Sequence, residues 1–294
     1  MIYNSNSLTH WAATVSRAIG IEPPKMAEPG LDWVNEVLEN LCKEGFDRVM
    51  IHNPDAVGEW LYEQYPDAFT PVLKHTQLTI PFKSPMPSVT PVCFGTMYTG
   101  VPPAVHGIQE YAKPVIPVDT FFEAALRAGK KVAVLATQNC SMNMIFLGKG
   151  HDVYICSTEA EILEKAHELI VKDCYDILCV YTWMFDTNDH RYGPKAPEAL
   201  ESLYQQGQYF DQLATWVEEN WKQHNTLIGF APDHGVHKAP EGTLNSKGKP
   251  IQGHHASDTP LDLNILHYFG VKLREKTIDP YFDPKKGPYE EQIG

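Results

Sequence analysis

The chain alternates between short apolar runs and longer segments in which apolar residues recur at helical spacing. The short runs, which are typical of buried strands, lie at Arg48 to His52, Lys130 to Ala136, 151–157, 175–185 and 225–235. The helical pattern covers Ser7 to Ile19, Leu31 to Cys42, Pro91 to Thr99, Asp119 to Gly129, Thr158 to Asp173 and 197–223. Strands that alternate with helices predict an α/β fold with a largely parallel central sheet and helices on both faces.

The chain shows no internal repeat and no low-complexity linker, and its 294 residues are enough to bury one large core. We therefore predict a single domain over residues 1–294, with a helical extension at residues 1–44. Residues 271–294 contain several prolines and no helical period, which predicts an irregular tail. Tyr281, Phe282 and Tyr289 favour docking of this tail over free disorder.

The formal net charge of −13 and the pI near 5.4 exclude an extended nucleic-acid partner, because no basic stripe is available for the phosphates. The N-terminus lacks the pattern of a signal peptide, and no apolar run reaches membrane-spanning length. The six cysteines show no metal or disulfide spacing. These features predict a cytoplasmic protein with reduced thiols and no membrane partner.

The segment from Pro87 to Ile108 carries the first signal of chemistry. Thr90 is a good N-cap residue, Pro91 suits the first helical position, and Gly100 is a good left-handed stop. Free N–H groups and the positive end of the dipole favour an anion at a helix N-terminus. A hydroxyl at this place would suit attack on a phosphate, although most Thr-Pro pairs only cap a helix.

Acidic and histidine residues follow several of the predicted strands, and they would converge along the carboxyl edge of the sheet. They are Asp55, Asp186, His190, Asp233, His234, His254 and His255. Carboxylate and imidazole donors suit zinc or manganese, and this number is enough for two ions in one site. Two such ions can hold the attacking and leaving oxygens of a phosphoryl transfer in line. Taken singly, each of these residues is more simply explained as a turn or cap residue.

The order of these motifs resembles the alkaline phosphatase superfamily. An Asp is followed by T-x(9)-G-x-x-P-x-x-HGI, then D-x-x-x-H-x-x-GP, then DHG and a terminal GHH. The chain is most similar to the type I phosphodiesterase and nucleotide pyrophosphatase branch, over the span from Asp55 to about Asp258. The resemblance implies an alkaline phosphatase-like fold and a small phosphate-ester or nucleotide substrate.

Matched position by position, the resemblance implies one metal ion held by Asp55, Thr90, Asp233 and His234. It implies a second ion held by Asp186, His190 and a histidine of the terminal motif. His255 is a better match than His254, because Ala-Ser-Asp follows it much as Gly-Tyr-Asp follows the family's histidine. The implied ions are zinc, and the implied mechanism is attack by Thr90 on phosphorus to form a phosphothreonine.

The chain departs from the diesterase pattern at two positions. Cys93 and Tyr111 stand where that branch usually has asparagines, and the second of these normally donates a hydrogen bond to the phosphoryl oxygen. Tyr111 and Lys113 are the candidate replacements for substrate binding. A lysine at this place would favour the extra charge of a monoester, with a solvated loop lysine as the alternative.

Only about thirty residues, mostly one predicted helix, separate His190 from the APDHG motif. This short connection leaves little room for a capping subdomain and predicts an open cleft. The segment 237–253 is rich in Gly, Lys and Pro and is expected to form a mobile flap, with His237 and Lys238 as candidate substrate contacts.

Three functions follow from these residues. The first is a two-metal hydrolase of phosphodiester or pyrophosphate bonds that acts through Thr90. The second is the same apparatus acting on phosphomonoesters, phosphonates or sulfate esters. The third is a non-enzymatic metal-binding relative.

Overall fold

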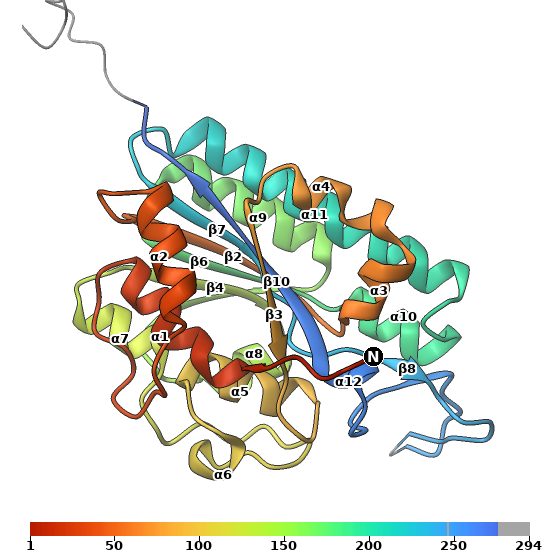
Figure 1. Ribbon diagram of the computed structural model, residues 1–294. Coiled ribbons are helices and arrows are strands. Elements are labelled where there is room, and N and C mark those ends of the chain that lie inside the picture. The colour runs from red at the N-terminus through yellow and green to blue at the C-terminus, as the bar shows by residue number, and fades with distance from the viewer. Residues whose placement is uncertain (246, 276–294) are drawn as a thin grey trace, which may run out of the picture.

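The computed structural model describes residues 1–245 and 247–275, and an eight-stranded sheet lies at its centre (Figure 1). The strands are β1 (Asn6–Ser7), β2 (Arg48–Pro54), β3 (Leu78–Lys83), β4 (Val132–Thr137), β5 (Asp152–Cys156), β6 (Ile177–Thr182), β7 (Thr226–Phe230) and β10 (Asn264–Lys272). They lie in the order β1-β3-β10-β7-β2-β6-β4-β5, and only β10 runs antiparallel to its neighbours. The predicted fold class, a largely parallel sheet in an α/β protein, is confirmed.

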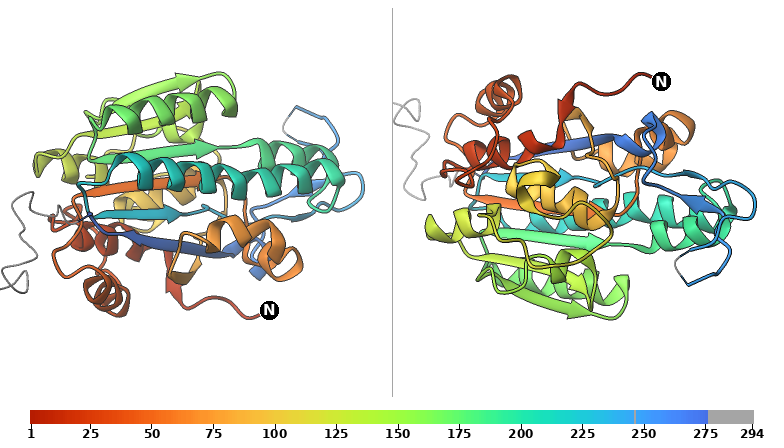
Figure 2. Two further views of the ribbon diagram at one scale, coloured as in Figure 1. Left: turned by 90° about the horizontal axis from the view of Figure 1, so that it is seen from above. Right: turned by 90° about the horizontal axis from the view of Figure 1, so that it is seen from below.

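Helices cover both faces of the sheet, as the views from above and below show (Figure 2). Next to one face lie α1 (Trp11–Ala18), α2 (Asp32–Leu41), α5 (Thr90–Thr99), α7 (Phe121–Arg127) and α8 (Ser141–Met144). Next to the other lie α3 (Glu59–Gln64), α4 (Thr70–Leu73), α9 (Glu159–Lys172), α10 (Met184–Tyr192) and α11 (Pro197–Asn220). The described residues also form two short helices, α6 (Pro103–His106) and α12 (Pro260–Leu263), and a two-stranded hairpin of β8 (His237–Lys238) and β9 (Gly253–His254). Two 3-10 helices, η1 (Leu8–His10) and η2 (Pro66–Phe69), lie between other elements.

The two helical layers explain why the central strands read as continuous apolar runs. Successive side chains of a strand point to opposite faces, so a strand that is covered on both sides is apolar at every position. In β2, Val49 and Ile51 enter the core on the α1/α5 side, whereas Met50 enters the core on the α9/α11 side. The carboxyl ends of β2, β6 and β7 are therefore held firmly at one edge of the sheet.

Three strands of the sheet, β1, β3 and β10, were not predicted. Pro81 lies within β3 and argues against a strand, because proline cannot donate to the ladder. It is tolerated because the two-residue β1 pairs only with Phe82 and Lys83 and does not reach it. β10 ends at Lys272, two residues inside the segment that was expected to be irregular, and residues 276–294 with Tyr281, Phe282 and Tyr289 lie outside the described residues.

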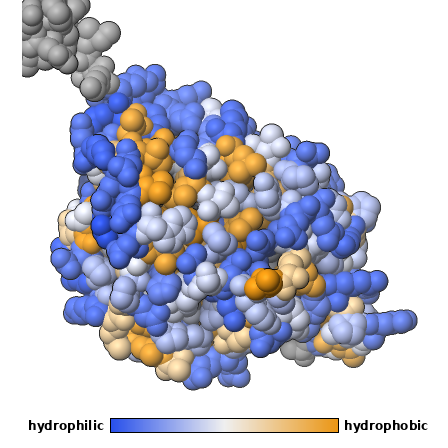
Figure 3. Space-filling view, viewed as in Figure 1, coloured by the Kyte–Doolittle hydropathy of each residue, from blue (hydrophilic) through white to orange (hydrophobic). Residues whose placement is uncertain are grey.

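The face seen in Figure 3 is mostly hydrophilic and carries only small apolar patches. In the described part of the chain, no helix combines the length and the apolar character that crossing a bilayer requires.

Candidate active site

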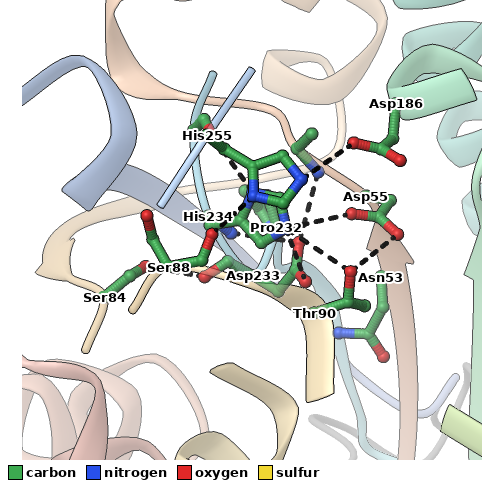
Figure 4. A network of polar contacts seen from close by, with 12 residues as sticks. Asn53, Asp55, Ser84, Ser88, Thr90, Asp186, Pro232, Asp233, His234 and His255 are labelled. Atoms are coloured by element: carbon green, nitrogen blue, oxygen red, sulfur yellow. Dashed lines mark hydrogen bonds and ion pairs between the residues drawn. The ribbon is translucent and has the colours of Figure 1, made fainter. Parts of the chain in front are cut away.

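The candidate residues meet at the carboxyl edge of the sheet, where β2, β6 and β7 end (Figure 4). Asp55 directly follows β2, and Asp233 and His234 follow β7. Asp186 lies in the first turn of α10, which follows β6, and His190 lies one helical turn further on the same face. The sequence separates these residues by up to 200 positions, and the parallel topology brings them together.

Six side chains form two groups, and within each group the donor atoms lie within 4.8 Å of one another. We call Asp55, Asp233 and His234 the first cluster, and Asp186, His190 and His255 the second cluster. In the first, His234 Nε2 lies 3.3 Å from Asp55 Oδ1 and 3.5 Å from Asp233 Oδ2. In the second cluster, the Nε2 atoms of His190 and His255 are 3.2 Å apart, and Asp186 Oδ1 lies 3.4 Å from His190 Nε2.

Thr90 stands beside the first cluster, but it is not the N-cap that the sequence predicted. α5 begins at Thr90, and the extended Val89 takes the N-cap position without a side-chain cap bond. The Thr90 hydroxyl instead donates to Asp55 Oδ2 at 3.4 Å and lies 3.5 Å from His234 Nε2. Gly100 ends the helix in the left-handed conformation, as predicted. Because the hydroxyl is not used for capping, it is available for chemistry.

Each histidine of the two clusters is oriented by a backbone carbonyl. His234 Nδ1 lies 2.9 Å from the oxygen of Gly235, His190 Nδ1 lies 2.9 Å from that of Gly253, and His255 Nδ1 lies 2.8 Å from that of Ser88. A carbonyl only accepts, so each Nδ1 carries the proton and each Nε2 turns a lone pair toward its cluster. This arrangement is the usual outer support of a metal-binding histidine. His254 is not part of either cluster.

The carboxylates of the two clusters also indicate a metal site. In the described part of the chain, Asp55 Oδ1, Asp186 Oδ1 and Asp233 Oδ2 are buried without a hydrogen-bond partner. Burial, with the nearby charges of Asp233 and Asp186, holds the pKa of Asp55 well above its usual range. Buried, unpartnered carboxylates require a compensating positive charge. The donor set of oxygens and imidazole nitrogens therefore fits divalent cations such as zinc or manganese.

A cleft of about 540 Å³ opens over both clusters. Tyr111 and Lys113 line it, and Lys113 Nζ donates to the backbone oxygen of Asn139 at 2.8 Å. Trp183 also lines the cleft, together with three residues of the 237–253 segment: Leu244, Asn245 and Ile251. That segment is anchored by the pairing of β8 with β9.

Of the two substrate contacts expected in this segment, neither lines the cleft in the described part of the chain. His237 Nδ1 lies 2.7 Å from Asp262 Oδ1, so this side chain is engaged elsewhere. Lys238 is exposed.

Sequence reasoning missed Tyr181, the penultimate residue of β6. Its hydroxyl donates to Asp55 Oδ2 at 2.5 Å, so the other oxygen of Asp55 is left to face the first cluster. Within the apolar run 175–185 it reads as one more core aromatic. The one sequence signal that could have identified Tyr181 as a site residue is its place near the end of a predicted strand that precedes Asp186.

Solved structures with similar folds include proteins from mouse, human and Sinorhizobium meliloti. Murine ectonucleotide pyrophosphatase/phosphodiesterase 5 has a TM-score of 0.58 at 12% identity, with 76% of this chain and 88% of that chain covered. Human ectonucleotide pyrophosphatase/phosphodiesterase 5 has a TM-score of 0.58 at 14% identity, with 76% of this chain and 87% of that chain covered. Phosphonoacetate hydrolase from Sinorhizobium meliloti bound to phosphonoacetate has a TM-score of 0.50 at 19% identity, with 70% of this chain and 60% of that chain covered.

These identities are low, so the similarity establishes the fold alone. No protein-family model matches the sequence, and no curated protein matches it either. The roles of individual residues therefore rest on the geometry of this chain.

Proposed function

We propose that the protein is a metal-dependent hydrolase of phosphodiester or pyrophosphate bonds with Thr90 as its nucleophile. The observation that carries this proposal is the Thr90 hydroxyl, which lies at the start of α5 and within 3.5 Å of donor atoms of the first cluster. Asp55, Asp233 and His234 would hold one ion together with Thr90, and Asp186, His190 and His255 would hold the other.

The residues of the chain supply the nucleophile and its orientation. Asp55 Oδ2 accepts a hydrogen bond from Thr90 and so directs Oγ1 toward the cleft. Oγ1 would form a bond to phosphorus while the bond from phosphorus to the leaving oxygen breaks, and water would then cleave the phosphothreonine. The positive end of α5 favours the charge on the transferred group. Bound divalent ions would supply neutralisation of charge on the attacking and leaving oxygens.

The cleft favours a small phosphate ester or nucleotide as substrate. Lys113 and Tyr111 line it beside the clusters and are the proposed substrate contacts. An inactive threonine-to-alanine variant of the murine relative is a complex with AMP, which supports a nucleotide-sized substrate for this cleft. The lysine also favours a second candidate: a phosphomonoester or phosphonate carries one more negative charge than a diester, and Lys113 would attract it.

The deciding experiment compares hydrolysis of bis(4-nitrophenyl) phosphate and 4-nitrophenyl phosphate, each with zinc and with manganese, for wild type and Thr90→Ala. We expect metal-dependent diester cleavage that falls by about 10³-fold or more in the variant. Preference for the monoester, with loss of that preference in Lys113→Ala, would establish the second candidate. A wild-type protein that binds metal but cleaves neither ester, and neither a pyrophosphate nor a phosphonate, would establish the non-enzymatic relative.

A further inference from the structure

Glu159 is a buried acid that takes no part in either cluster. It is the first residue of α9, and only 4% of it is exposed. The N-terminus of its own helix is capped by Thr158, whose hydroxyl accepts the N–H of Glu161. The side chain of Glu159 is therefore not needed at the start of α9.

The Glu159 carboxylate instead caps another helix. Its Oε1 accepts the backbone N–H groups of Trp183 at 2.6 Å and of Met184 at 2.7 Å, at the N-terminus of α10. Trp183, the N-cap residue of α10, makes no side-chain cap bond. A carboxylate at this end satisfies two otherwise unpaired donors and opposes the positive end of the helix dipole.

This helix holds two of the three side chains of the second cluster, Asp186 and His190. Its carboxyl end is tied separately, because Gln252 N donates to the oxygen of His190 at 2.8 Å and His190 Nδ1 donates to Gly253. Glu159 is thus the tether at the amino end. The first cluster depends on other elements, because its residues follow β2 and β7.

A distant acid is a costly way to cap a helix. Burial raises the pKa of Glu159, while the N–H groups of Met184 and Trp183 oppose this rise. A Ser, Thr, Asp or Asn at position 183 would accept the N–H of residue 185 or 186, and not the N–H groups of residues 183 and 184. Position 183 is a tryptophan that lines the cleft. The acceptor for the N–H groups of residues 183 and 184 is therefore supplied by Glu159, from outside α10.

We propose that Glu159 is a positioning residue for the second cluster: by capping α10 it sets where Asp186 and His190 present their donor atoms. The proposal rests on the proposed function, because it assigns a metal ion to that cluster. It predicts a selective effect, in which loss of the cap weakens the second metal site and leaves the first unchanged.

The experiment titrates zinc against a chromophoric chelator in metal-free protein, for wild type, Glu159→Ala, Glu159→Gln and Glu161→Ala. We expect wild type to bind two ions and Glu159→Ala to bind one of them at least about tenfold more weakly. Glu159→Gln keeps an acceptor oxygen at the same place and should restore most of the affinity. Glu161→Ala is the matched control, because it removes the acceptor of the Ser157 N–H on the same helix turn without touching α10.

The site that weakens is identified by a double-mutant cycle with Asp186→Asn. In that background, adding Glu159→Ala should cause no further loss at the remaining site. Should Glu159→Ala not fold, Glu159→Asp takes its place, since the shorter side chain retains the charge but draws back from both N–H groups. Unchanged affinity at both sites, equal weakening of both, or the same loss in Glu161→Ala would each overturn the inference. A wild-type protein that binds no zinc would instead remove the proposed function.

Discussion

The two clusters of the candidate active site differ in how the chain builds them. The first is buried, with side-chain exposures of 3% for Asp55 and 0% for Asp233 and His234. The second is more open, with exposures of 20% for Asp186, 30% for His190 and 8% for His255. The first cluster follows central strands of the sheet, whereas the second lies on a nine-residue helix and after the short strand β9.

This difference makes the first cluster rigid and the second cluster adaptable. Strand ends in a covered sheet fix the first cluster beside Thr90, at the cost of crowding negative charge in a dry place. The second cluster is held by tethers at the two ends of α10, so its donor atoms depend on contacts that single substitutions can remove. Solvent can also enter the second cluster and substitute for a lost ligand.

The largest contrast should appear in zinc affinity. We expect His234→Ala to weaken one site by about 10³-fold or more, because the imidazole of His234 is fully buried and solvent reaches its position less easily than the open second cluster. His190→Ala should weaken the other site by only about 10–100-fold, because its position is partly open to solvent. Chelator competition measures both losses. Equal losses in the two variants would contradict the contrast.

A second contrast concerns the stability of metal-free protein. Burial and the charge of Asp233 raise the pKa of Asp55 above its value in the unfolded chain, so its contribution to stability is lost as the pH rises through the folded-state pKa. At pH 7.5, Asp55→Asn should therefore raise the free energy of unfolding by roughly 1–2 kcal/mol. Asp186→Asn, at the open cluster, should change it by less than about 0.5 kcal/mol.

Urea denaturation in the presence of a chelator gives both values. The sign should reverse when zinc is added, because the asparagine weakens metal binding and the wild type then gains more stability. If Asp55→Asn is less stable than wild type in chelator, burial and charge repulsion at Asp55 do not destabilise the metal-free protein.

The smallest effect on zinc affinity should come from Tyr181, which orients Asp55 through a hydrogen bond to Oδ2. Tyr181→Phe removes this bond and should lower zinc affinity of the first site by about tenfold, without changing the second. Tyr154→Phe is a suitable control, because its hydroxyl contacts Tyr175 away from the site. If the second site weakens as much as the first, the tyrosine acts on the whole cleft and not on Asp55.

Most of the sheet and its helices could be predicted from local pattern. A strand covered on both faces is apolar throughout, so β2, β4, β6 and β7 can be recognised in the sequence as apolar runs. β10 is different, because His267 and Gly270 interrupt its apolar run. It becomes a strand by pairing with β3 and β7 on its two sides, which is long-range information.

By itself, the sequence determined the α/β class, the order of the chemical motifs and the edge at which Asp55, Asp233 and His234 would gather, because period and strand polarity are local properties. The tertiary structure decided which ring nitrogen of each histidine faces its cluster, because that depends on carbonyls such as Ser88 O, far away in the chain. It also decided that the Thr90 hydroxyl points to Asp55 and not to its own helix. It likewise decided that Glu159 caps α10, since hydrogen bonds between distant segments exist only after the core has packed.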